Sequence, residues 1–250
     1  MPLLRCVALA PAHDPRWANA ALPWGTDGVV LDLDALVHPR RVDEARRAVA
    51  EHLRRPPAQG TLTPPLLVRL PASPPVEDWD AVNASRLGGI VLAGAEEALQ
   101  VAHAGTRLEE IERAQGLPPG SLPLFLSLET GKGLWHLADL VQASPRVQGV
   151  ILGLGDAVYD LADTPEPVPF YRLPIPRYST PLFVYSRTAY LACALGIQRL
   201  VCLGTSIAPG WANASLLEQG ARRASALGFT GAVTVHPEGV RACQAFFPPG

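Results

Sequence analysis

Eight short apolar runs, rich in β-branched residues, recur along the chain, and each is followed by a turn and a stretch of helical character. The runs cover residues 4–9, 28–33, 66–70, 89–92, 124–128, 149–152, 199–203 and 232–235. They are nearly continuous in hydrophobicity rather than alternating, which is typical of parallel strands covered on both faces. Eight strand-then-helix units in 250 residues predict an α/β fold, a (β/α)8 TIM barrel. An open doubly wound sheet is the main alternative, because periodicity does not show closure.

Helical patterns lie between these runs, and nothing in the sequence divides residues 1–250 into separate domains. The expected helices cover residues 42–55, 76–85, 95–115, 134–143, 182–195 and 214–227, with weaker ones at 15–22 and 238–247. A proline-rich stretch at residues 163–181 breaks the rhythm after the sixth strand. So many prolines predict a non-helical loop, which is either a lid over the site or a stiff spacer.

The charge balance and the cysteines exclude several classes of protein. There are 21 basic and 23 acidic residues, so no basic surface predicts binding to nucleic acid or to an anionic membrane. Four scattered cysteines form neither a zinc motif nor a disulfide framework, and no apolar run is long enough to span a bilayer. We therefore expect a cytoplasmic protein. The only lysine is Lys132, so a Schiff-base mechanism would have to use it; its glycine neighbours indicate an ordinary loop residue.

Polar side chains follow most of the predicted strands at their carboxyl ends, whereas the amino ends carry no comparable set. These residues are Asp32, Asp34, Arg69, Glu129, Thr130, Asp156, Thr205, Ser206 and His236. The carboxyl ends of barrel strands converge on one face, where barrel enzymes place their active sites. We expect His236 to be structural, since no other histidine has ligand spacing to it.

Glu129 and Asp156 end successive strands, whose axes lie about 4.8 Å apart, so both carboxylates can reach one ion. Two carboxylates with the other positions left to water and substrate suit Mg²⁺. The alternative for Asp156 is a helix cap. Arg69 is expected to clamp a substrate carboxylate or an enolate oxygen. A structural salt bridge to Asp32 is the alternative for Arg69.

Several motifs resemble those of citrate lyase β-subunit-like proteins in the HpcH/HpaI aldolase/citrate lyase family. They are residues 10–15, 27–34, 68–70, 89–92, 128–130, 153–156 and 227–237, and they match in order over almost the whole chain. The resemblance implies a (β/α)8 barrel, a homo-oligomer that is a trimer or hexamer, and Mg²⁺-dependent cleavage or formation of a carbon–carbon bond. It also implies that Glu129 and Asp156 hold the metal and that Arg69 is catalytic.

On this resemblance we expect a carbon–carbon lyase of the retro-aldol or Claisen type, acting on a small dicarboxylate or its CoA thioester. Asp32, Asp34 and Thr130 are expected to join Arg69 in binding substrate. The chain departs from the family elsewhere: the Pro-Lys after strand four is Ala93-Gly94, and the lysine before strand eight is Ala232. The alternative is therefore a catalytically impaired barrel that binds a ligand or a partner. An unrelated barrel enzyme with a phosphate site has only Gly204 and Gly239 in its favour.

Overall fold

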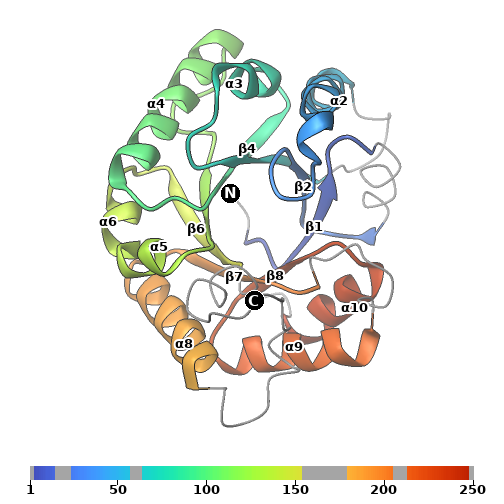
Figure 1. Ribbon diagram of the computed structural model, residues 1–250, viewed down its shortest axis with the longest axis vertical. Coiled ribbons are helices and arrows are strands. Elements are labelled where there is room, and N and C mark those ends of the chain that lie inside the picture. The colour runs from blue at the N-terminus through green and yellow to red at the C-terminus, as the bar shows by residue number, and fades with distance from the viewer. Residues whose placement is uncertain (1–2, 15–23, 57–63, 154–178, 205–212, 248–250) are drawn as a thin grey trace.

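The chain folds into a closed barrel of eight parallel strands, paired in sequence order from β1 to β8 and back to β1. This is a computed structural model, and it describes residues 3–14, 24–56, 64–153, 179–204 and 213–247. The helices surround the strands on the outside (Figure 1). The closed strand order confirms the (β/α)8 barrel and excludes the open sheet.

All eight predicted strands are present, with ends that differ by up to two residues. They are β1 (Cys6–Pro11), β2 (Gly28–Asp32), β3 (Leu66–Pro71), β4 (Leu87–Ala93), β5 (Leu124–Leu128), β6 (Val147–Leu152), β7 (Gln198–Cys202) and β8 (Gly231–Thr234). Most strand residues are buried, as expected for strands that face both the barrel interior and the helices.

The helices follow the expected order around the barrel. They are η2 (Pro39–Arg41), α2 (Val42–Arg54), α3 (Val76–Val82), α4 (Ala98–Gln115), α5 (Gly131–Trp135), α6 (Leu137–Gln142), α8 (Ser179–Ala194), α9 (Ala214–Ala226) and α10 (Pro237–Phe246). The expected helix at 15–22 lies outside the described residues. None of the helices in the described ranges is both long and apolar enough to cross a membrane.

Two helix predictions need correction. The segment predicted as one helix at 134–143 is two helices, because Thr130 caps a turn that already begins at Gly131 and His136 has a non-helical backbone between them. The predicted loop at 163–181 ends earlier than expected, since α8 begins at Ser179. Pro181 is tolerated there because the first-turn N–H groups of a helix have no partner within the helix. Residues 163–178 lie outside the described part.

Alternate strand residues point into the barrel, as the two-residue period of a strand requires. One buried cluster takes in Val30 of β2, Leu67 of β3, Val91 of β4 and Phe125 of β5, while their strand neighbours pack against the helices in a second cluster. The Phe125 ring needs space: a Cβ added at Gly149 of β6 would lie 2.7 Å from it. The barrel interior is therefore packed, and a site is possible only at its ends.

Candidate functional site at the carboxyl ends of the strands

The inward-facing positions turn from apolar to polar toward the carboxyl ends of three strands. Two residues beyond inward Val30 and Leu67 come Asp32 and Arg69, whose Cα atoms are paired in register. On β5 the inward series continues to Ser127, which is 4% exposed. The period of the strands thus places an acid, a guanidinium and a hydroxyl in one layer above the apolar core.

Arg69 contacts three carboxylates at this end of the barrel. Its Nη1 lies 3.0 Å from Oδ1 of Asp32 and 3.0 Å from Oδ2 of Asp34, and its Nη2 lies 2.5 Å from Oε1 of Glu129. Arg69 and Asp32 are both buried, whereas Asp34 and Glu129 reach the surface of the site. The salt bridge that the sequence offered as an alternative to a substrate clamp is therefore present, within a larger cluster.

The cluster carries an excess of negative charge, with one guanidinium among three carboxyl groups. Burial lowers the pKa of Arg69, but the charges of Asp32, Glu129 and Asp34 outweigh this effect, and its pKa lies above the ordinary value. Burial raises the pKa of the Asp34 carboxyl, and Asp32 and Glu129 add to the rise against the opposing effect of Arg69. Arg69 is thus a permanent cation, and the site around it attracts a further cation.

Asp32 organises the turn that follows β2. Its Oδ1 accepts the backbone N–H of Asp34 at 3.0 Å, and its Oδ2 accepts that of Leu36 at 2.6 Å. Both oxygens are therefore occupied, and the side chain has no exposed surface. Asp32 holds Arg69 and aims Asp34 toward it. We expected Asp32 to bind substrate; its contacts in the structure are with the protein.

Glu129 is held through one oxygen. Its Oε1 accepts from Ser127 Oγ at 2.6 Å as well as from Arg69. Among the described residues, Oε2 has no hydrogen-bond partner, and the position of a Cβ added at Gly94 would be 3.8 Å from it. One carboxylate oxygen is thus fixed and the other is left for a ligand. Sequence reasoning missed Ser127, although a hydroxyl two residues before a strand-end carboxylate must share its face.

The other predicted residues divide into two groups. Thr130 Oγ1 accepts the N–H of Gly133 at 3.0 Å and so caps α5. Lys132 is half exposed and pairs with Glu97 at 3.0 Å. His236 is buried at the start of α10, and its structural role stays a prediction. The remaining members, Asp156, Thr205 and Ser206, lie outside the described residues.

A metal site is not complete within the described part of the chain. No group of three His, Cys, Asp or Glu side chains is arranged there to hold an ion. The guanidinium of Arg69 lies among Asp32, Asp34 and Glu129 and holds them at hydrogen-bond distance. The donor set still fits Mg²⁺, which takes oxygen ligands and usually keeps several waters, so that one or two carboxylates suffice.

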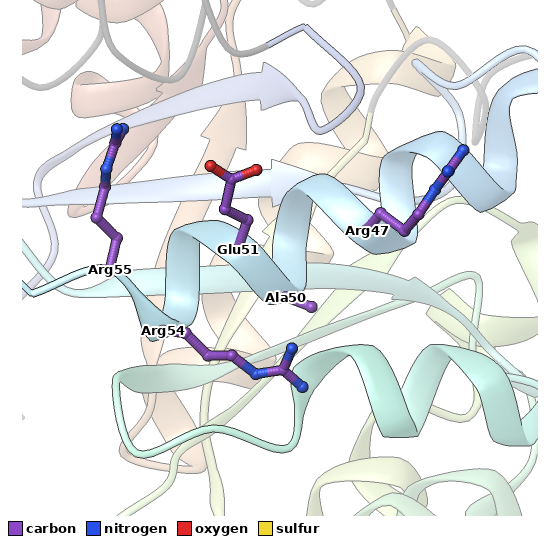
Figure 2. Close-up of a pocket in the computed structure, with 5 residues that line it drawn as sticks. All are labelled: Arg47, Ala50, Glu51, Arg54 and Arg55. Carbon is purple, nitrogen blue, oxygen red and sulfur yellow. The ribbon is translucent and has the colours of Figure 1, made fainter.

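A hollow on the outside of α2 is a different feature. It is lined by Arg47, Ala50, Glu51, Arg54 and Arg55, all from one helix and the residue after it (Figure 2). The helix lies outside the barrel strands (Figure 1). The hollow therefore does not belong to the strand-end cluster.

The fold and the strand-end cluster define a TIM-barrel protein with a charged site at the carboxyl ends of its strands, the position of the active site in barrel enzymes. Residues 5–237 match the family model HpcH/HpaI aldolase/citrate lyase. The chain belongs to this family, whose members are enzymes of the carbon–carbon lyase type.

Individual relatives agree with this assignment. The chain is 28% identical to a citrate lyase subunit beta-like protein of Deinococcus radiodurans, over 99% of this chain and 81% of the relative. Among solved structures it is similar to a citrate lyase beta subunit from M. tuberculosis complexed with oxaloacetate and magnesium (TM-score 0.73, 22% identity, 99% of this chain and 98% of that one). It is also similar to malate synthase of Haloferax volcanii (TM-score 0.78, 17% identity, 99% and 75%). At these identities the structures show the shared fold.

Proposed function

We propose that the chain is a Mg²⁺-dependent carbon–carbon lyase of the retro-aldol or Claisen type, acting on a small dicarboxylate or its CoA thioester. The observation that carries this proposal is Arg69 among Asp32, Asp34 and Glu129 at the carboxyl ends of the strands. The similar M. tuberculosis protein, which was solved with oxaloacetate and magnesium, supports the choice of ligands.

Arg69 is the proposed catalytic and substrate-binding residue. A guanidinium has five N–H donors in a fixed fork, and the three carboxylate contacts use three of them. Within the described ranges the other two have no hydrogen-bond partner, and they are the proposed donors to a substrate carboxylate or to the oxygen that gains charge as the carbon–carbon bond breaks. Because three carboxylates surround it, the guanidinium is oriented before substrate arrives, and no reorganisation is needed during the reaction.

Glu129 and Asp156 are the proposed metal ligands, and Asp34 and Thr130 are kept as proposed substrate contacts. Ser127 and Arg69 hold one oxygen of Glu129, which leaves its other oxygen for the ion. Bound Mg²⁺ would supply a Lewis acid that neutralises substrate oxygens at the site. Asp32, with both oxygens occupied, positions Arg69.

The second candidate is a barrel of the same family that binds a carboxylate without cleaving it. Gly94 and Ala232 stand at positions where the family resemblance leads us to expect lysines, and none of the described side chains is assigned as the general base. This candidate shares the Mg²⁺ and carboxylate sites with the first, so only turnover separates the two.

The test is a titration of the full chain with Mg²⁺ by calorimetry, followed by a cleavage assay on oxaloacetate, malate and their CoA thioesters. We expect saturable binding that Glu129→Gln weakens and that exposed Glu77→Gln leaves unchanged. Arg69→Lys should keep metal binding and lose most turnover, because lysine lacks the fork. Failure of Mg²⁺ to bind would refute the metal site, and binding without turnover of any of these acids would select the second candidate.

Two further proposals concern the setting of the enzyme. We propose a homo-oligomer, as the family resemblance implies, and a reducing compartment such as the cytoplasm. The second proposal is supported by the sequence, in which the four cysteines are scattered and form no disulfide framework.

A further inference from the structure

Two of the four cysteines are buried in the core and lie against each other. Cys6 of β1 is 2% exposed and Cys243 of α10 is fully buried, whereas Cys193 is exposed and Cys202 is partly exposed. The thiol of Cys243 shares a hydrogen bond with the thiol of Cys6. The two sulfur atoms are therefore in contact, although one belongs to the first strand of the barrel and the other to the helix that follows its eighth strand.

The periods of the strand and of the helix explain this contact. On β1, Cys6 shares the helix-facing side with Ala8 and Ala10, in the cluster that packs between strands and helices. On α10, Val240 and Cys243 are both buried, and residues three apart lie on the same face of a helix. The Cys6 thiol donates a weak hydrogen bond to the carbonyl oxygen of Val240, with Sγ at 3.9 Å. The buried face of α10 thus brings Cys243 to Cys6.

Close packing of α10 against the barrel holds the two thiols in place. The helix lies outside the barrel and contacts both β8 and β1 (Figure 1). A Cβ added at Gly239 of α10 would overlap the side chain of Thr234 of β8, so only glycine lets the helix come this close. A cysteine sulfur moves by rotation about a single bond, and a disulfide bond is about 2.05 Å long. A small rotation of Cys6 and Cys243 therefore suffices to join sulfurs that are already in contact.

The surroundings of the pair decide which chemistry it can perform. The hydrogen bond with Cys6 and burial raise the pKa of the Cys243 thiol, and the negative charge of Asp27 adds to the rise. Cys243 therefore stays protonated at neutral pH, and a protonated thiol is neither a nucleophile nor a metal ligand. Oxidation is the reaction that such a pair still offers, because two sulfurs in contact can share one new bond.

We propose that Cys6 and Cys243 are a redox-sensitive pair, which closes into a disulfide between β1 and α10 when the protein meets hydrogen peroxide. In the first step the peroxide oxidises one thiol to a sulfenic acid, the O–O bond breaks and one water leaves. In the second step the other sulfur attacks the sulfenic sulfur, the S–S bond forms and a second water leaves with the proton of that thiol. Two thiols thus give two electrons to one peroxide, and a thiol reductant reverses the change. In a reducing compartment the pair stays reduced, and the inference does not depend on the proposed lyase activity.

The first test maps the link in the full chain. Native protein is treated with hydrogen peroxide, and urea-unfolded protein is refolded with reduced and oxidised glutathione, so that access to the buried pair does not limit the second sample. After alkylation of free thiols, mass spectrometry of the unreduced digest should find the peptide of Cys6 joined to that of Cys243. Cys243→Ala should abolish this species, and Cys193→Ala, at an exposed position, should retain it. Absence of the joined peptides from both samples, or a link through Cys193 or Cys202 instead, would overturn the proposal.

The second test asks whether the native packing accommodates the bond. A link between β1 and α10 closes a loop of most of the chain, which restricts the unfolded state and should raise the melting temperature by on the order of 10 °C. Dithiothreitol should reverse the rise, and Cys243→Ala treated with the same oxidant should show none. A linked protein that melts no higher than the reduced protein would show that the bond strains the fold, and would overturn the proposal.

Discussion

The buried ion pair between Glu112 of α4 and Arg146, just before β6, is predicted to protect the barrel down to strongly acid pH. Arg146 Nη1 and Nη2 contact Oε1 and Oε2 of Glu112 at 2.6 and 2.7 Å. The backbone N–H groups of Gly120 and Leu122 donate to the same oxygens at 2.9 and 2.8 Å. Glu112 is 1% exposed, so the carboxylate has exchanged its water for four protein donors. We choose Glu112→Gln as the perturbation, because it keeps the size and removes the charge.

The size of the effect follows from the pKa of this carboxyl group. Burial raises the pKa, but the hydrogen bonds from Arg146 and from the backbone N–H groups of Leu122 and Gly120 lower it more, to about 2 from 4.5. Each pKa unit corresponds to 1.36 kcal/mol, so the ionised group contributes about 3 kcal/mol to the free energy of unfolding. The folded-state pKa is depressed, so this contribution is present above pH 4.5 and is lost as the pH falls toward 2.

The assay is urea unfolding of the wild type and Glu112→Gln at pH 7 and pH 3. We expect the variant to be less stable at pH 7 and the difference to shrink by about 2 kcal/mol at pH 3, where the unfolded carboxylate is mostly protonated. Glu110→Gln on the same helix is the control: its partner Arg107 is half exposed, so both pH values should show a change below about 0.5 kcal/mol. If Glu112→Gln lowers the free energy of unfolding equally at both pH values, the pKa argument is refuted and the loss must come from packing alone.

Three further outcomes are expected. Ser127→Ala should raise the dissociation constant of Mg²⁺ about tenfold by calorimetry, because the hydroxyl orients the proposed metal ligand; unchanged affinity would contradict this role. Lys132→Ala should retain cleavage activity, and borohydride with oxaloacetate should trap no adduct by mass spectrometry, since a half-exposed, ion-paired lysine is no Schiff base. Gly231→Ala should lower the free energy of unfolding by about 2 kcal/mol or more, because its Cβ would lie 2.5–2.7 Å from backbone atoms of Leu4 and Arg5; an unchanged melting temperature would contradict this.

The strands were predictable because burial on both faces leaves a continuous apolar run in the sequence. The pairing of residues across neighbouring strands could not be predicted, since register and barrel closure depend on contacts between distant segments. Arg69 shows the difference. Its place at a strand end was evident from the sequence, but its contacts with Asp34 and Glu129 required the closed barrel. The early start of α8 was missed for a local reason. Proline is excluded from the interior of a helix but is tolerated in its first turn.

The pair of Glu112 with Arg146 and the strand-end cluster around Arg69 are both buried, but they differ in their balance of charge. Glu112 and Arg146 lie before β5 and β6, on the amino-terminal side, and there one carboxylate meets one guanidinium with every carboxylate oxygen paired. A buried ion pair is compatible with a stable fold when its charges balance and its polar atoms all have hydrogen-bond partners. At the carboxyl ends, Arg69 meets three carboxylates, two more than its charge balances. Burying that excess works against folding, and burial already raises the pKa of Asp34. A cation bound at Glu129 would remove the excess, so the salt bridge of Arg69 and a functional site are parts of one arrangement.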